Sequence, residues 1–110
     1  MSACRPAVAP AESRILMFTL HIEHSVRDYD AWKQMFDSDP LGRKTAGVSS
    51  FRIMRPVDDV ESVRIDLDFD SRTDAEKMKV ALEELWKGPG VALMRNPRAL
   101  LTETVADVTL

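Results

Sequence analysis

The stretch Val63–Ser71, "VRIDLDFDS", does most to decide the fold that this sequence predicts. Its side chains alternate strictly, with apolar Val63, Ile65, Leu67 and Phe69 set against charged Arg64, Asp66 and Asp68. Because successive side chains of a strand point to opposite faces of a sheet, one face of this strand is apolar and the other is charged. The apolar face belongs in a core, and the open question is what the charged face contacts.

Three further strands are predicted around this one. The first covers 15–24, where Leu16, Phe18, Leu20 and Ile22 face away from Met17, Thr19, His21 and Glu23. A second strand at 48–55 is joined to 63–69 by a turn rich in proline and aspartate, a pattern typical of a hairpin. The last strand is predicted at 99–105.

Two helices are predicted between the strands. Asp28 is a suitable N-cap for the first, in which Tyr29, Trp32, Met35 and Phe36 share a face, and Asp39 before Pro40 should end or restart it. For the second, Thr73 and Glu76 form a capping box, and "KGPG" at 87–90 ends the helix. Its buried stripe is Ala75, Met78, Leu82 and Leu85, widened by Ala81 and Trp86. Residues 91–97 are ambiguous between a loop and a short turn of helix.

The predicted order is strand, helix, strand, strand, helix, strand. This order is typical of the ferredoxin-like α+β fold (βαββαβ), a four-stranded antiparallel sheet with both helices on one face. A chain of 110 residues suits one domain, which we place at 15–110 after a flexible extension at 1–14.

Charge and cysteine content narrow the function classes. The net charge of −3 argues against a nucleic-acid partner, which usually selects a basic face. The only cysteine, Cys4, rules out an internal disulfide and makes a reducing cytoplasm the expected setting. No apolar run is long enough to cross a membrane, so no membrane partner is expected.

The face of the sheet that the helices leave uncovered is polar. It collects Met17, Thr19, His21, Glu23, Ser50, Arg52, Met54, Arg64, Asp66 and Asp68. Open solvent is the simplest environment for it. RNA is disfavoured because the face carries no aromatic side chain for base stacking. The third environment is a second copy of the chain, in a closed homodimeric barrel where Arg52 or Arg64 would pair with Asp66 or Asp68.

A family resemblance favours the barrel. The segments "DYDAWKQMFDSDPLGRKTAGVSSFRIMRPVDD", "VRIDLDFDSRTDAEKM" and "PRALL" resemble small bacterial proteins of the dimeric α/β-barrel superfamily, related to antibiotic biosynthesis monooxygenase-like proteins. The likeness runs from about Met17 to Val105. The superfamily includes cofactor-independent monooxygenases, muconolactone isomerases, polyketide cyclases and haem-degrading enzymes. The resemblance implies a dimer and a pocket between helix and sheet, and it selects no reaction.

His21 is the leading candidate for a catalytic residue. From the mixed face it could act as a general base near neutral pH, with Asp66 orienting it and Arg52 stabilising developing negative charge. The competing interpretation, which we favour, is that His21 only forms hydrogen bonds inside a polar dimer interface. "HIEH" at 21–24 gives too few convergent ligands for a metal, so no metal site and no cofactor are predicted.

Three further residues are candidates for substrate contacts. Arg43 could hold a carboxylate or enolate, Trp32 could form the wall of an apolar pocket, and Asp68 could complete the site. Arg43 and Trp32 have simpler alternatives, and so does the role given to Arg52. The alternative is solvent exposure for Arg43 and an ion pair with Asp66 for Arg52, and we favour it for both arginines. For Trp32 the alternative is core packing, which is the commoner fate of such an aromatic residue.

Two hypotheses therefore stand. In the first, the chain is a homodimeric enzyme that oxygenates, isomerises or cyclises a small organic or aromatic molecule without a cofactor. In the second, it is a non-catalytic small-molecule-binding or structural dimer.

Overall fold

The computed structural model describes residues 17–88 and 95–110, which form one four-stranded antiparallel sheet and two helices. The elements follow in the order β1 (Phe18–Ser25), α2 (Tyr29–Asp37), β2 (Val48–Met54), β3 (Ser62–Phe69), α3 (Arg72–Leu85) and β4 (Arg95–Glu103). The strand order is β2-β3-β1-β4, so the two central strands come from different halves of the chain. The predicted ferredoxin-like βαββαβ fold is confirmed. The predicted extension at 1–14 lies outside the described residues.

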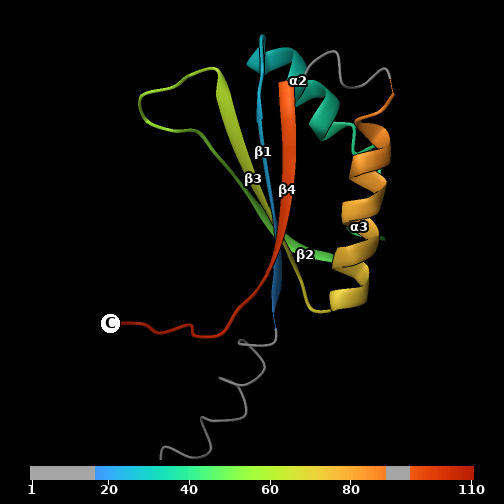
Figure 1. The fold of residues 1–110 in the computed structure, drawn as a ribbon, viewed down its shortest axis with the longest axis vertical. Helices are drawn as coiled ribbons and strands as arrows, with labels where there is room; N and C mark the ends of the chain where they lie inside the picture. The colour runs from blue at the N-terminus through green and yellow to red at the C-terminus, as the bar shows by residue number, and fades with distance from the viewer. Residues whose placement is uncertain (1–16, 89–94) are drawn as a thin grey trace, which may run out of the picture.

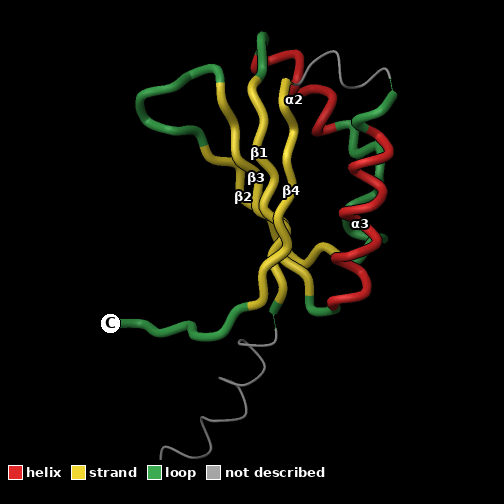
Figure 2. The backbone as a smooth tube through the Cα atoms, in the orientation of Figure 1, coloured by secondary structure: helices red, strands yellow, loops and turns green. Residues whose placement is uncertain are grey.

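Both helices cover the same face of the sheet (Figure 1). The tube in Figure 2 shows that the opposite face, which we call the open face, has no helix over it. The core between helices and sheet is made of ten buried apolar residues: Leu20, Ile22, Val26, Trp32, Val63, Ile65, Leu67, Phe69, Ala75 and Met78. All four apolar members of the Val63–Phe69 alternation belong to it, as predicted.

The register of β1 against β3 determines which polar side chains meet on the open face. His21 is paired with Asp66, Thr19 with Asp68, and Glu23 with Arg64. On the other side of β3, Arg52 is also paired with Asp66. Cross-strand partners lie about 5 Å apart, so these charges fall within ion-pair distance of one another.

Helix α3 begins two residues earlier than the predicted capping box. Ser71 is the N-cap, and its side chain accepts a hydrogen bond from the backbone N–H of Asp74 at 3.2 Å. Thr73 lies inside the helix, so its assignment as the cap was wrong. Ser71 and Thr73 both carry a hydroxyl that could cap the helix, and Ser71, the residue nearer to β3, is the one that does.

Ser71→Ala is expected to lower the free energy of unfolding by about 1 kcal/mol, because it removes the acceptor for that N–H. Thr73→Ala, which leaves the cap in place, serves as the control and should change stability by less than about 0.5 kcal/mol. Urea denaturation of both variants measures the difference. A larger loss for Thr73→Ala would restore the capping box.

Strand β4 begins at Arg95 and ends at Glu103, whereas the sequence predicted 99–105. Pro97 lies within the strand although proline cannot donate to a ladder, because β4 is an edge strand, where proline is tolerated. Asn96 has a positive φ of 52°, next to an irregularity in the pairing of Glu23 and Ser25 with β4. Of the ambiguous residues 91–97, the last three therefore belong to the strand, and the others lie outside the described residues.

Helix α2 begins after Asp28, whose carboxylate accepts from Ala31 N–H at 3.1 Å as predicted. It ends at Asp37 and does not restart at Pro40. Asp39 instead adopts a positive φ of 56°, and its carboxylate accepts from the backbone N–H of Arg43 at 2.9 Å. This strained turn places residues 39–43 beside the core.

Candidate functional site

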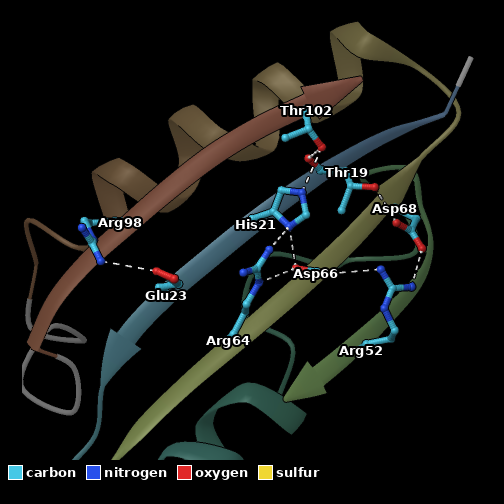
Figure 3. A network of polar contacts seen from close by, with 9 residues as sticks. All are labelled: Thr19, His21, Glu23, Arg52, Arg64, Asp66, Asp68, Arg98 and Thr102. Atoms are coloured by element: carbon cyan, nitrogen blue, oxygen red, sulfur yellow. Dashed lines mark hydrogen bonds and ion pairs between the residues drawn. The ribbon is translucent and has the colours of Figure 1, made fainter. Parts of the chain in front are cut away.

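Eight side chains of the open face form one hydrogen-bonded cluster, the open-face network, and Figure 3 draws all of them except Ser50. They are Thr19, His21, Ser50, Arg52, Arg64, Asp66, Asp68 and Thr102. Three of them were predicted as catalytic residues and a fourth, Asp68, as a substrate contact. The structure brings these four together.

Asp66 is the centre of the network and is only 7% exposed. One carboxylate oxygen lies 2.7 Å from His21 Nδ1 and 3.4 Å from Arg64 Nε, and the other accepts from Arg52 Nη2 at 3.2 Å. Burial alone would raise the pKa of this carboxyl, but the hydrogen bonds from His21, Arg52 and Arg64 outweigh it and lower the pKa below its usual value. Asp66 is therefore a firmly ionised carboxylate at neutral pH.

Both ring nitrogens of His21 have partners within the protein. The Thr102 hydroxyl donates to the Thr19 carbonyl at 3.3 Å, so it accepts from His21 Nε2 at 2.9 Å. His21 Nδ1 faces Asp66 and also lies 2.9 Å from Arg64 Nη2. Asp66 can accept a hydrogen bond from Nδ1 only if that nitrogen carries a proton, whereas Arg64 can donate one to it only if it carries a lone pair. The two contacts therefore require opposite protonation states of Nδ1. Neither nitrogen is left free for a substrate.

Arg52 bridges the two aspartates, with its Nη1 donating to Asp68 at 3.0 Å. The predicted alternative role of Arg52, an ion pair with Asp66, is therefore present together with a second pair to Asp68. The other Asp68 oxygen accepts from the Thr19 hydroxyl at 2.8 Å. The acids of the alternating strand are thus neutralised within one chain.

A separate apolar pocket lies on the other face of the sheet, between helices and strands, and we call it the helix-side pocket. Its volume is about 70 Å³. Its walls come from core residues of β1, β3, α2 and α3, and both tryptophans of the chain, Trp32 and Trp86, line it. The polar residues at its wall are His24, Asp39 and Arg43. A pocket with apolar walls and a few polar groups is the usual form of a small-molecule site.

Arg43 and Trp32 belong to this pocket. The Arg43 guanidinium lies 4.0 Å from the Phe36 ring centroid and 4.9 Å from that of Phe51, and Nη1 donates to the Phe36 carbonyl at 2.8 Å. Its side chain is only 17% exposed, so the predicted alternative of solvent exposure was wrong. Trp32, at 1% exposed, is a core residue as well as a pocket wall.

The residues predicted to form one site are therefore divided between the two faces of the sheet. His21, Asp66, Arg52 and Asp68 lie on the open face, while Trp32 and Arg43 lie with the helices. From the sequence, Arg43 was predicted as a substrate contact of the same site as Arg52. The turn at Asp39 and the two aromatic rings hold Arg43 on the opposite side.

His24 is the pocket residue that sequence reasoning missed. It lies on the face of β1 shared by Leu20 and Ile22, is 5% exposed, and its ring centroid is 5.4 Å from that of Trp32. Its Nδ1 lies 3.4 Å from the Ser25 carbonyl, and Nε2 has no hydrogen-bond partner among residues 17–88 and 95–110. The alternation of the strand could have predicted its burial, because His24 lies on the same face as Leu20 and Ile22.

Burial lowers the pKa of His24 below its usual 6.5, and the hydrogen bond to Ser25 offsets this only in part. The unfolded chain therefore binds more protons at this site, and the His24 contribution to stability should fall as the pH drops below 6.5. Titration of the two imidazoles by proton NMR, assigned with His24→Phe, measures this. A His24 midpoint at or above 6.5 would contradict it.

Within the described ranges, no group of three or more His, Cys, Asp and Glu side chains is placed to hold a metal ion. No helix in that part of the chain is long and apolar enough to cross a membrane.

Several solved structures are similar to this chain at low sequence identity. A variant of SnoaB, a cofactor-independent oxygenase from Streptomyces nogalater, matches with a TM-score of 0.66 at 14% identity, over 84% of this chain and 96% of that chain. A dimeric ferredoxin-like protein from an uncultured marine organism matches with a TM-score of 0.59 at 16% identity, over 84% and 98%. A protein from Nitrosomonas europaea, provisionally assigned as an antibiotic biosynthesis monooxygenase, matches with a TM-score of 0.62 at 17% identity, over 81% and 90%.

No protein-family model and no curated protein sequence matches the chain. The structural neighbours are thus monooxygenase-like and dimeric ferredoxin-like proteins, as the sequence resemblance predicted. At these identities they establish the fold.

Proposed function

We propose that this protein is a homodimeric α/β-barrel enzyme that acts on a small organic or aromatic molecule without a cofactor, as a monooxygenase, isomerase or cyclase. The observation that carries the proposal is the helix-side pocket, with its apolar walls and its few polar groups. The description of SnoaB as a cofactor-independent oxygenase on the same fold supports it.

His24 supplies the chemistry that such a reaction needs. With its pKa lowered, the imidazole is neutral at pH 7, and its partnerless Nε2 can accept a proton from an enol, a phenol or a carbon next to a carbonyl. Return of that proton to another carbon completes an isomerisation. Oxygenation of the same anion requires dioxygen as the oxidant.

The size of the pocket limits the substrate. At about 70 Å³ it is roughly half of the 150 Å³ that suffices for benzene in an engineered apolar cavity. The substrate is therefore about one ring or smaller, or it displaces the turn at residues 39–43 on entry.

The open face supports the homodimer. Besides the open-face network it exposes the apolar side chains of Met54 and Leu100. The C-terminal segment after β4 leads away on the side of the sheet opposite the helices and exposes Val105, Val108 and Leu110 (Figure 1). A second copy packed on this face would cover these residues and enclose the paired charges.

The fluorescence of Trp32 and Trp86 tests the pocket, because the chain has no tryptophan elsewhere. Titration with toluene and phenol should give saturable changes in emission. Oxygen uptake and product formation are then followed over a panel of one-ring phenols, enols and lactones. His24→Phe, which keeps a ring against Trp32, should lose turnover at least about 100-fold and still bind toluene.

The open face offers a second assignment of the base. There His21 would take the proton, Asp66 would orient it and Arg52 would stabilise the anion, with Asp68 contacting the substrate. His21→Gln then loses turnover and His24→Phe keeps it.

A non-catalytic dimer remains the second candidate function. The observation in its favour is that both nitrogens of His21 are occupied by the protein, as expected of a structural network. Binding of toluene without turnover of any substrate in the panel would favour this function.

A further inference from the structure

We propose that the open face binds a small, multiply charged anion in a cavity lined by arginines at the Ser25 and Ser62 ends of β1 and β3. This cavity has a volume of about 570 Å³ and opens to solvent. Its arginines lie on the open face, and among the described residues His24 is the one that lines both this cavity and the helix-side pocket. The inference concerns a different ligand and different side chains, so it goes beyond the proposed function. We call this site the arginine-lined cavity.

The charge at this cavity differs from that of the chain as a whole. Among residues 17–88 and 95–110, three arginines line it, Arg64, Arg95 and Arg98, and Glu23 is the only acid in its wall. The chain carries a net charge of −3. A cluster of like positive charge in an acidic protein lowers its own stability unless an anion neutralises it.

The arginines retain hydrogen-bond donors for a ligand. A guanidinium carries five N–H donors, and toward the residues that the structure describes Arg98 uses only its Nη2 group, which donates to Glu23 at 3.3 Å (Figure 3). Arg95 lies 3.8 Å from a Glu61 oxygen, too far for a hydrogen bond. Arg64 directs Nε toward Asp66 and Nη2 toward His21, and its Nη1 has no partner in the described part of the chain.

The ion pairs of Arg95 and Arg98 are weak enough for a ligand to displace. In the single chain the side chains of Arg95 and Arg98 are 52% and 78% exposed, and those of Glu61 and Glu23 are 70% and 44% exposed. Exposed pairs of this kind add little to stability. A ligand with two or more negative groups can bridge guanidiniums that one carboxylate side chain cannot.

Two chemical sources fit this recognition, a small di- or tricarboxylate and a phosphate ester or pyrophosphate. Carboxylates are planar and phosphates are tetrahedral, and arginine binds the oxygens of either group through paired N–H groups. The proposed homodimer would place the same face against a second copy. Binding is therefore measured on the full chain in its native oligomeric state.

Isothermal titration calorimetry at low ionic strength tests the proposal with citrate and inorganic pyrophosphate as probes. The tighter of the two identifies the source, and acetate should bind much more weakly than either. Arg95→Gln and Arg98→Gln should each weaken binding about fivefold, the loss of charged hydrogen bonds reduced by solvent exposure. Glu23→Gln should strengthen it severalfold, because it removes the competing carboxylate.

Two control variants carry the same change in net charge at a remote place. Arg72→Gln and Glu76→Gln alter an exposed pair on α3 and should leave the affinity within about twofold of the wild type. Absence of saturable binding by either probe overturns the proposal. So does an equal loss in Arg72→Gln and Arg98→Gln, since that would reflect net charge alone.

Discussion

Replacing Trp32 with alanine is expected to lower the free energy of unfolding by about 4 kcal/mol, the largest effect of any single change considered for this chain. The indole is 1% exposed and packs against three rings, with centroid distances of 5.2 Å to Phe36, 5.4 Å to His24 and 5.7 Å to Tyr29. Its removal takes away the transfer free energy of the side chain and enlarges a pocket that is already present.

Urea denaturation at fixed protein concentration measures this loss, and an unchanged slope against urea would show that the denatured state is comparable. Trp86→Ala is the matched control, since that indole lies at the C-terminal end of α3 and is only partly buried. We expect its cost to be about half as large. A loss below about 1 kcal/mol for Trp32→Ala would mean that the helix does not pack on the sheet as described.

Asp66→Ala is expected to cost about 3 kcal/mol. The change leaves His21, Arg52 and Arg64 without their shared acceptor in a part of the sheet where Asp66 itself is 7% exposed. Breaking a fully buried pair costs roughly 3–5 kcal/mol, and the half-exposed arginines place this case at the lower end. Asp37→Ala, which removes an exposed partner of Lys33, should cost less than about 0.5 kcal/mol.

The Asp66 effect should depend on pH in a defined direction. The pKa of this carboxyl is lowered on folding, so the unfolded chain binds its proton first as the pH falls. The stabilisation is complete above the unfolded value of 3.8 and is lost as the pH drops through the lower folded value. The stability difference between wild type and Asp66→Asn, measured from pH 7 to pH 2, should therefore shrink at the acid end. A constant difference would contradict the assigned network.

The fold could be predicted because its strands carry an alternation that allows one register. In Val63–Phe69 a slip of one residue would turn every apolar side chain to the charged face, so the sequence itself determines which side meets the helices. The pairing of Arg52 with Asp66 followed from the same faces. Residues on the open face were thus predicted as a set, as were the contacts of Asp66 with Arg52 and His21. The hydrogen bonds of Thr19 and Thr102 were not predicted.

The candidate site was harder to predict because it depends on turns. The positive φ of Asp39 and the position of Arg43 between Phe36 and Phe51 arise from the exit of α2, which no periodicity describes. His24 was set aside because it points away from His21, although that direction leads into the core. The start of β4 was missed because Pro97 is acceptable only on an edge strand, and strand order is not visible in a sequence.

The molar mass in solution, determined by size-exclusion chromatography with light scattering at micromolar concentration, tests the central claim most directly. A barrel closed by two open faces predicts twice the mass of one chain, with the charges of "VRIDLDFDS" inside it. A mass equal to one chain would leave Asp66, Asp68 and their arginines facing water and would contradict the homodimeric barrel.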